Sequence, residues 1–240
     1  MGSAEMRRRF ARARLGQVWI MLSSALLVSS MGLVWSFLWK QPVGEMLPFI
    51  AIGMMVWQLL TSVLNDSALA FPANSHYFLN QYMSASTIIY AVLYRNGVTF
   101  LLNMIYPLVL CIVLGNAPNL YTCLTVVGLA CLTISCFLMG YVIAILCARF
   151  RDIVQILTTF LQVIFFVTPV LWKPEFLPLQ AHQLLAWNPF ALLIAIVRDP
   201  LLGRPVSGFT WISALGLALF TALVALPFIG KFSRRVVYWL

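Results

Sequence analysis

Residues 148–172 read ARFRDIVQILTTFLQVIFFVTPVLW, and this stretch decides the class of fold. It opens with a charged cluster of Arg149, Arg151 and Asp152, and it then runs without another charge as far as Pro169 and Trp172. A helix of about 20 apolar residues rises about 30 Å, which is the thickness of a bilayer's hydrocarbon core. The segment therefore predicts a transmembrane span that follows a basic elbow at the cytoplasmic face.

The composition of the chain extends this prediction to its whole length. The 240 residues are 62% hydrophobic and only 9% charged, which is too little charge to cover the surface of a soluble domain of this size. No polar stretch is long enough to bury a core of its own. We therefore expect residues 1–240 to form a single all-α integral membrane domain.

Six apolar runs, separated by polar or Pro/Gly-containing segments such as Asn65-Asp66, predict six transmembrane helices. Their expected ranges are 18–39, 47–64, 86–114, 121–147, 153–172 and 209–230.

The basic residues indicate how these spans are oriented. With both termini inside, the cytoplasmic side carries Arg7, Arg8, Arg9, Arg12, Arg14, Arg149, Arg151, Lys231, Arg234 and Arg235, and the outside carries Lys40, Lys173, Arg198 and Arg204. This bias predicts an N-in, C-in topology. The net charge of +9 sits at the ends of apolar runs and not on a groove-sized surface, so nucleic-acid binding is not expected.

Three segments outside the spans have their own patterns. Residues 5–17 combine arginines with Met6 and Phe10 at helical spacing, which indicates an interfacial helix on the inner leaflet or a plain positive-inside anchor. Residues 65–84 form a polar, aromatic connection, in which Pro72 followed by a cap at Asn74 or Ser75 would start a short helix. Such a helix suits docking on a partner protein, although a simple loop also fits.

The segment after the fifth span is too hydrophobic for a free outer loop. Pro174 and Pro178 break it early, and Asn188-Pro189 can cap and start a helix over 190–197. We expect two short re-entrant helices within residues 174–203. Non-helical backbone at this depth requires protein or a water-filled cavity around it, which favours the mouth of a pore.

Residues for catalysis, nucleotide binding or metal binding are not grouped in this sequence. Gly230-Lys231 lacks the glycine-rich loop of a phosphate-binding motif, and the Asp and Glu residues are scattered. His76 has no second ligand nearby, and no cysteine pair has the spacing of a zinc site. We expect no enzyme activity, no metal and no cofactor in this chain.

An ordered set of short motifs resembles the permease subunits of ABC-2 type polysaccharide exporters. The motifs are residues 14–19 (RLGQVW), the elbow 149–152, Thr168-Pro169-Val170 with Trp172, and 187–190 (WNPF) continuing to 198–203 (RDPLLG). These motifs lie in order along nearly the whole chain. The amino-acid sequence of residues 187–203 is similar to that of O-antigen permeases.

The resemblance implies a homodimer in the bacterial inner membrane that engages two copies of a separate ATPase, which would carry ATP and Mg. The substrate implied is an undecaprenyl-diphosphate-linked, O-antigen-like polysaccharide. The helix within 65–84 would couple to the ATPase through Pro72, His76, Tyr77, Phe78 and Tyr82. The outer helices within 174–203 would gate the channel.

Candidate substrate contacts fall into two groups. Arg95 inside the third span, with Arg149, Arg151 and Arg14, would attract the diphosphate or another lipid head group. Arg95 would otherwise snorkel to the interface or pair with Asp66, and Arg151-Asp152 would otherwise be a structural elbow. The candidate pore and gate residues, suited to sugars, are Tyr90, Tyr94, Phe160, Phe165, Trp172, Trp187, Asn188 and Phe190; tryptophans near span ends are otherwise membrane-belt anchors.

Two other functions remain open at this stage. The same architecture serves exporters of drugs or small lipids, and also exporters of capsule or teichoic-type polymers. A stand-alone proton-coupled carrier would be expected to place acidic residues or histidines at mid-membrane, which this sequence does not show.

Overall fold

The computed structural model describes residues 16–76, 84–115, 119–176, 185 and 187–239, and within these residues all regular structure is helical. By length and composition, 5 helical segments can cross a membrane. They are α2 (Gly16–Leu38), α3 (Val43–Ala73), α5 (Ala85–Val113), α6 (Leu124–Arg149) with the preceding 3-10 turn η1 (Leu120–Cys123), and α10 (Gly208–Phe232). The chain is therefore a multi-pass membrane protein.

Shorter helices complete the fold: α7 (Ile153–Val167), η2 (Pro174–Phe176), α9 (Pro189–Leu201) and η3 (Ser233–Tyr238). Helix α7 begins where the fifth span is predicted, but it ends at Val167, before Trp172. Pro169 has no N–H to donate and disfavours helical geometry at Thr168, so the helix stops there. The 15 residues of α7 rise only about 22 Å, less than the hydrocarbon core.

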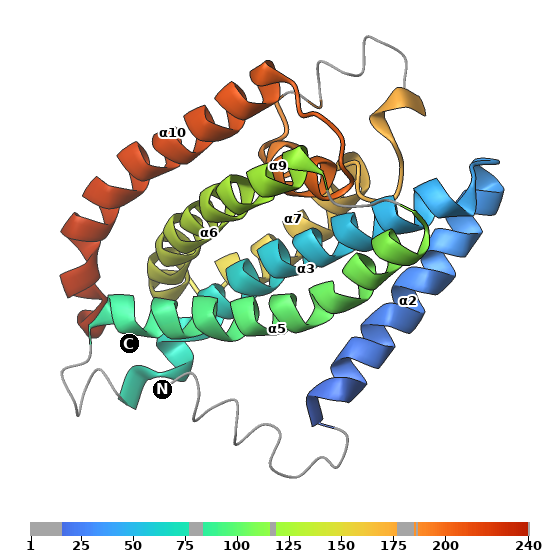
Figure 1. The fold of residues 1–240 in the computed structure, drawn as a ribbon. Coiled ribbons are helices and arrows are strands. Elements are labelled where there is room, and N and C mark those ends of the chain that lie inside the picture. Colours follow the sequence, from blue (N-terminus) through green and yellow to red (C-terminus); the bar gives the residue numbers. More distant parts are fainter. Residues whose placement is uncertain (1–15, 77–83, 116–118, 177–184, 186, 240) are drawn as a thin grey trace.

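Helix α3 forms the centre of the bundle. It contacts α2, α5, α6, α7 and α9, and its buried side chains, such as Ile52, Leu60 and Val63, supply much of the main core cluster. Helices α2 and α10 lie on opposite flanks (Figure 1). Both flanking helices carry many exposed apolar side chains, as expected for helices that face lipid.

The predicted end of the second span at residue 64 is wrong, because α3 continues through Asn65 and Asp66 to Ala73. These polar residues have partners on neighbouring helices, so they do not end the helix. Asn74 is the C-cap of α3, and its side-chain amide donates to the Ala70 carbonyl at 2.8 Å. The short helix predicted after it falls mostly on residues outside the described part of the chain. Ser75 and His76 are helical again.

The extra turns of α3 pack against the start of α5, the end of α6 and η3. A second core cluster joins these elements, with Phe71, Ile89 and Tyr141 at its centre. We call this part of the molecule the Arg149 end. The opposite part, which holds the start of α3, the end of α7, and α9, is the Glu45 end.

Candidate functional site

A cavity of about 590 Å³ lies between α2, α3 and α7. Three aromatic rings line it, together with amide and hydroxyl side chains and several aliphatic ones. The aromatic and polar residues are Trp57, Phe165, Phe166, Thr61, Asn65, Thr158 and Gln162. We call these residues the α3–α7 face.

The helical repeat places the three α3 residues of this face on one side of the helix. Trp57, Thr61 and Asn65 are four residues apart, so they lie above one another on the face of α3 turned toward α7. The Trp57 ring lies 5.4 Å from the Phe165 ring, between centroids. Trp57 is 8% exposed, whereas Phe166 is 75% exposed. The Trp57 side of the face is therefore buried, and the Phe166 side, its open edge, is exposed.

A smaller cavity of about 210 Å³ continues from this face beneath α2. It shares Leu27, Met54, Trp57 and Thr61 with the larger cavity and adds Ser24 and Gln58. Aromatic rings present apolar faces, while amides and hydroxyls both donate and accept hydrogen bonds. The combined surface suits a molecule that has apolar faces and many hydrogen-bonding edges.

Arg95 of α5 forms an ion pair with Asp66 of α3, with 2.7 Å between Nη2 and Oδ2. Asn96 donates to the same carboxylate oxygen at 2.8 Å. The Arg95 side chain is 25% exposed, so it is partly buried between the two helices and does not face lipid as an unpaired charge. The structural pair is therefore present, and it fastens α3 to α5 at the level where both helices enter the Arg149 end.

The basic elbow forms as predicted between α6 and α7. Arg149 ends α6, Phe150 is extended, and Arg151 and Asp152 form the turn before α7. The Arg149 guanidinium lies over the Trp239 ring at 5.1 Å from its centroid. This contact attaches the elbow to the C-terminal turn, while Arg151 is exposed to an approaching anion.

The non-helical segment after α7, residues 168–173, is called the α7 break. Both ends of α9 contact it. Asn188 caps α9 by accepting from the backbone N–H groups of Phe190 and Ala191, as predicted, and its amide donates to the Thr168 hydroxyl at 3.0 Å. Arg198 in the last turns of α9 donates to the Pro169 carbonyl at 2.6 Å. Buried non-helical backbone needs partners for its carbonyl groups, and Arg198 supplies one.

Arg198 is only 2% exposed and has two further partners. Its guanidinium lies 3.8 Å from the centroid of the Phe49 ring, and its Nε donates to Asp199 at 3.0 Å. Arg198 therefore joins α9, the α7 break and α3 into one unit, which we call the α9 clamp.

A second ionic contact at the Glu45 end lies nearer to the surface. Glu45, in the first turn of α3, accepts from Lys173 at 3.1 Å and lies 3.7 Å from Arg204. Lys173 precedes α9 in the chain and Arg204 follows it, so the Glu45 carboxylate contacts residues on both sides of this helix. The Glu45 side chain is 55% exposed, which makes this contact much weaker than the α9 clamp.

The family model described as ABC-2 type transporter matches residues 1–202. The chain belongs to the ABC-2 type transporter family.

Curated relatives are similar over most of this ABC-2 chain at low identity. An O-antigen export system permease protein RfbA of Klebsiella pneumoniae is 21% identical over 236 residues, which cover 96% of this chain and 90% of the relative. A protein of the same description from Myxococcus xanthus is 25% identical over 193 residues, covering 79% of this chain and 74% of the relative.

The predicted pore and gate residues of the ABC-2 chain are dispersed in the structure. Phe165 lines the α3–α7 face, and Phe160 is exposed on α7 beside it. Tyr90 and Tyr94 are exposed on α5 and line neither cavity of this site.

The residues predicted for the gate also lie in different environments. Trp187 is exposed, and Trp172 is half-buried near the start of α3. Asn188 is buried as the cap of α9, and Phe190 is buried in the main core cluster.

Some predicted residues lie outside the described part of the chain. They are Arg14 with the interfacial helix to residue 15, and the coupling residues Tyr77, Phe78 and Tyr82. The first of the two outer helices falls largely on residues 177–184 and 186, which also lie outside it. Pro72 belongs to the last turn of α3, and His76 is exposed just after it.

Sequence reasoning missed the residues that build the α3 side of the site. Trp57 and Thr61 precede Asn65 at four-residue spacing, and this polar-aromatic row inside an apolar run was the available signal. Thr158 lies one turn before Gln162 on α7 and follows the same rule.

Proposed function

We propose that this chain is the membrane-spanning permease subunit of an ATP-driven exporter of lipid-linked polysaccharide. The observation that carries the proposal is the α3–α7 face, where three aromatic rings and several amide or hydroxyl groups line one cavity of about 590 Å³. Sugars have apolar C–H faces and hydroxyl edges, and this mixture complements both. The family match and the names of the curated relatives agree with an exporter of this kind.

In the proposed assembly two copies of the chain form a channel and two copies of a separate ATPase bind ATP and Mg. The exposed side of α7 carries Ile156, Phe160, Val163 and Phe166, an apolar surface beside the cavity. A second copy packed on this surface would close the open edge of the α3–α7 face into a channel. The short α7, the following break and α9 together would complete a sixth crossing, with both termini in the cytoplasm of a bacterial inner membrane.

The Arg149 end is the proposed cytoplasmic end. Helix α3 ends and α5 begins there, and the ion pair between Asp66 and Arg95 fixes these two helices together. A push from an ATPase on the chain between them would therefore move α3 and α5 as one. Arg151, which is exposed, would meet the diphosphate of an undecaprenyl-linked substrate at this membrane face, and Arg14 is proposed to join it.

The test is reconstitution of the chain and its ATPase in liposomes with a fluorescent lipid-linked glycan supplied on the ATPase side. We expect ATP-dependent delivery of glycan to the other side only when both proteins are present. Phe166→Ala should lower delivery, because Phe166 lies on the α3–α7 face, whereas Phe220→Ala on the exposed side of α10 should not. Extrusion of drugs or small lipids without glycan delivery would contradict the proposal.

A further inference from the structure

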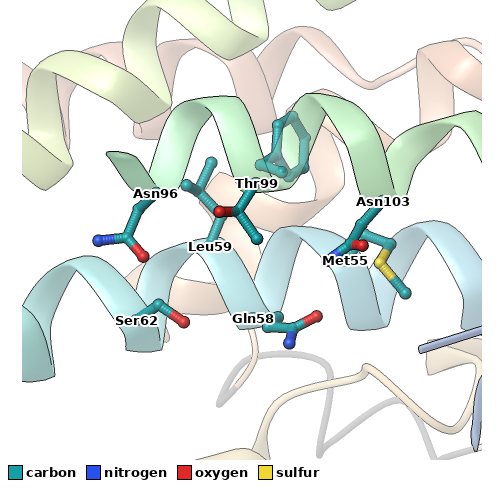
Figure 2. A pocket seen from close by; sticks show the side chains of 8 residues that line it. Met55, Gln58, Leu59, Ser62, Asn96, Thr99 and Asn103 are labelled. Atoms are coloured by element: carbon teal, nitrogen blue, oxygen red, sulfur yellow. The ribbon is translucent and has the colours of Figure 1, made fainter. Parts of the chain in front are cut away.

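A narrow polar cleft lies between α3 and α5, next to the smaller cavity beneath α2, with which it shares Met55 and Gln58. Figure 2 shows Gln58 and Ser62 of α3 facing Asn96, Thr99 and Asn103 of α5 across this cleft. Met55, Leu59 and Phe100 complete its lining. Amide and hydroxyl groups are therefore concentrated between two helices that cross the membrane.

Asn103 has an unsatisfied polar atom in this cleft. The residue is only 3% exposed, and its Oδ1 has no hydrogen-bond partner among the described residues. A buried carbonyl oxygen without a donor is unfavourable, and surrounding lipid chains offer it none. A donor of another origin would remove this cost.

The size and chemistry of the cleft restrict what that donor can be. Its volume of about 30 Å³ exceeds what one water molecule needs and is far too small for a sugar ring. None of the residues that line it carries a charge, so nothing in the cleft favours an ion. An apolar guest would leave the Asn103 oxygen unpaired, whereas a water can donate to it and still bond to Gln58, Ser62 or Thr99.

We propose that the cleft between α3 and α5 is an ordered water site in which a bound water donates to the Asn103 side-chain carbonyl. The water makes this part of the α3–α5 contact polar and hydrated, while the pair of Asp66 and Arg95 holds the same two helices nearer the Arg149 end. Hydrogen bonds through water re-form after a small displacement, so the polar part of the α3–α5 contact tolerates small movements while the ion pair keeps the two helices together.

The test is X-ray radiolytic footprinting of the detergent-solubilised chain. Radicals made from a bound water oxidise the side chains beside it, and Phe100 lines the cleft while being only 7% exposed. Phe71 is the matched control, because it is 0% exposed and lies in the core cluster of the Arg149 end. We expect Phe100 to be oxidised faster than Phe71.

The variant Asn103→Leu replaces the acceptor by an aliphatic side chain that fills the cleft. It should reduce oxidation of Phe100 to the rate of Phe71, while Phe71 itself stays as slow as in the unaltered chain, which reports that the variant is folded. Equal oxidation of Phe100 and Phe71 in the unaltered chain would overturn the proposal whatever the variant does. Oxidation of Phe100 that persists in a folded Asn103→Leu variant would overturn it as well.

Discussion

At the scale of single residues, several charged side chains of the described bundle form ion pairs, and the depth of burial decides how much each pair matters. The pair of Asp66 and Arg95 is partly exposed, with 37% and 25% of the two side chains accessible. Arg198 is buried and satisfies a carbonyl of non-helical backbone. These two sites therefore give different predictions.

A double-mutant cycle tests the first pair. Asp66→Asn and Arg95→Gln should each lower stability modestly, and the coupling between them should be about 0.5–1 kcal/mol, because solvent screens a partly exposed pair. The measurement is thermal unfolding of the two single variants and the double variant in detergent. A coupling of zero would mean that the ion pair does not fasten α3 to α5.

The α9 clamp gives a stronger prediction. Arg198→Met leaves the Pro169 carbonyl without its donor and Asp199 without its buried partner, so it should destabilise the chain by on the order of 3 kcal/mol. Arg204→Met is the matched control. Arg204 is 40% exposed and its contact with Glu45 is long, at 3.7 Å, so its loss should cost about 0–1 kcal/mol. Similar unfolding temperatures for both variants would refute the clamp.

At the scale of elements, the packing of α9 onto α6 depends on the absence of a side chain. A Cβ added to Gly128 would lie 2.2 Å from the Ile196 carbonyl oxygen, so the backbones of α6 and α9 touch at this glycine. Gly97 in α5 has nothing within 4 Å of the same position. Alanine substitutions at the two glycines therefore distinguish the effect of close packing from the effect of helix propensity.

Gly128→Ala should destabilise the chain by about 1–3 kcal/mol through overpacking of α6 against α9. Gly97→Ala should be neutral or stabilising by up to about 1 kcal/mol, since alanine is the better helix former. Unfolding in detergent compares the two variants. A Gly128→Ala variant as stable as Gly97→Ala would show that α9 does not pack on α6 at this residue.

The element scale also shows how far the sequence predicts the fold. The start of α9 follows from Asn188-Pro189, because a cap followed by proline acts locally. The full length of α3 does not follow, because Asp66 stays helical through a partner on α5 that the sequence cannot locate. The short α7 was signalled by Pro169, yet the hydrophobic run beyond it suggested a longer span.

At the scale of the whole molecule, the arrangement of helices decides which residues form the site. Trp57 of α3 and Phe165 of α7 are far apart in sequence, and only the packing of α2, α3 and α7 brings them to one cavity. Periodicity identifies the faces of each helix but not which faces meet, so Tyr90 and Tyr94 could not be separated from Phe165 by sequence alone. The central claim, that polysaccharide passes along the α3–α7 face, belongs to this scale.

The measurement that tests this claim most directly is photo-crosslinking during export. A photoreactive phenylalanine analogue is placed at residue 166 on the α3–α7 face, or at residue 220 on the exposed side of α10, in liposomes that contain the ATPase and lipid-linked glycan. We predict a glycan adduct at residue 166 that requires ATP, and none at residue 220. Adducts at residue 220 alone, or at neither residue while glycan is exported, would contradict the account.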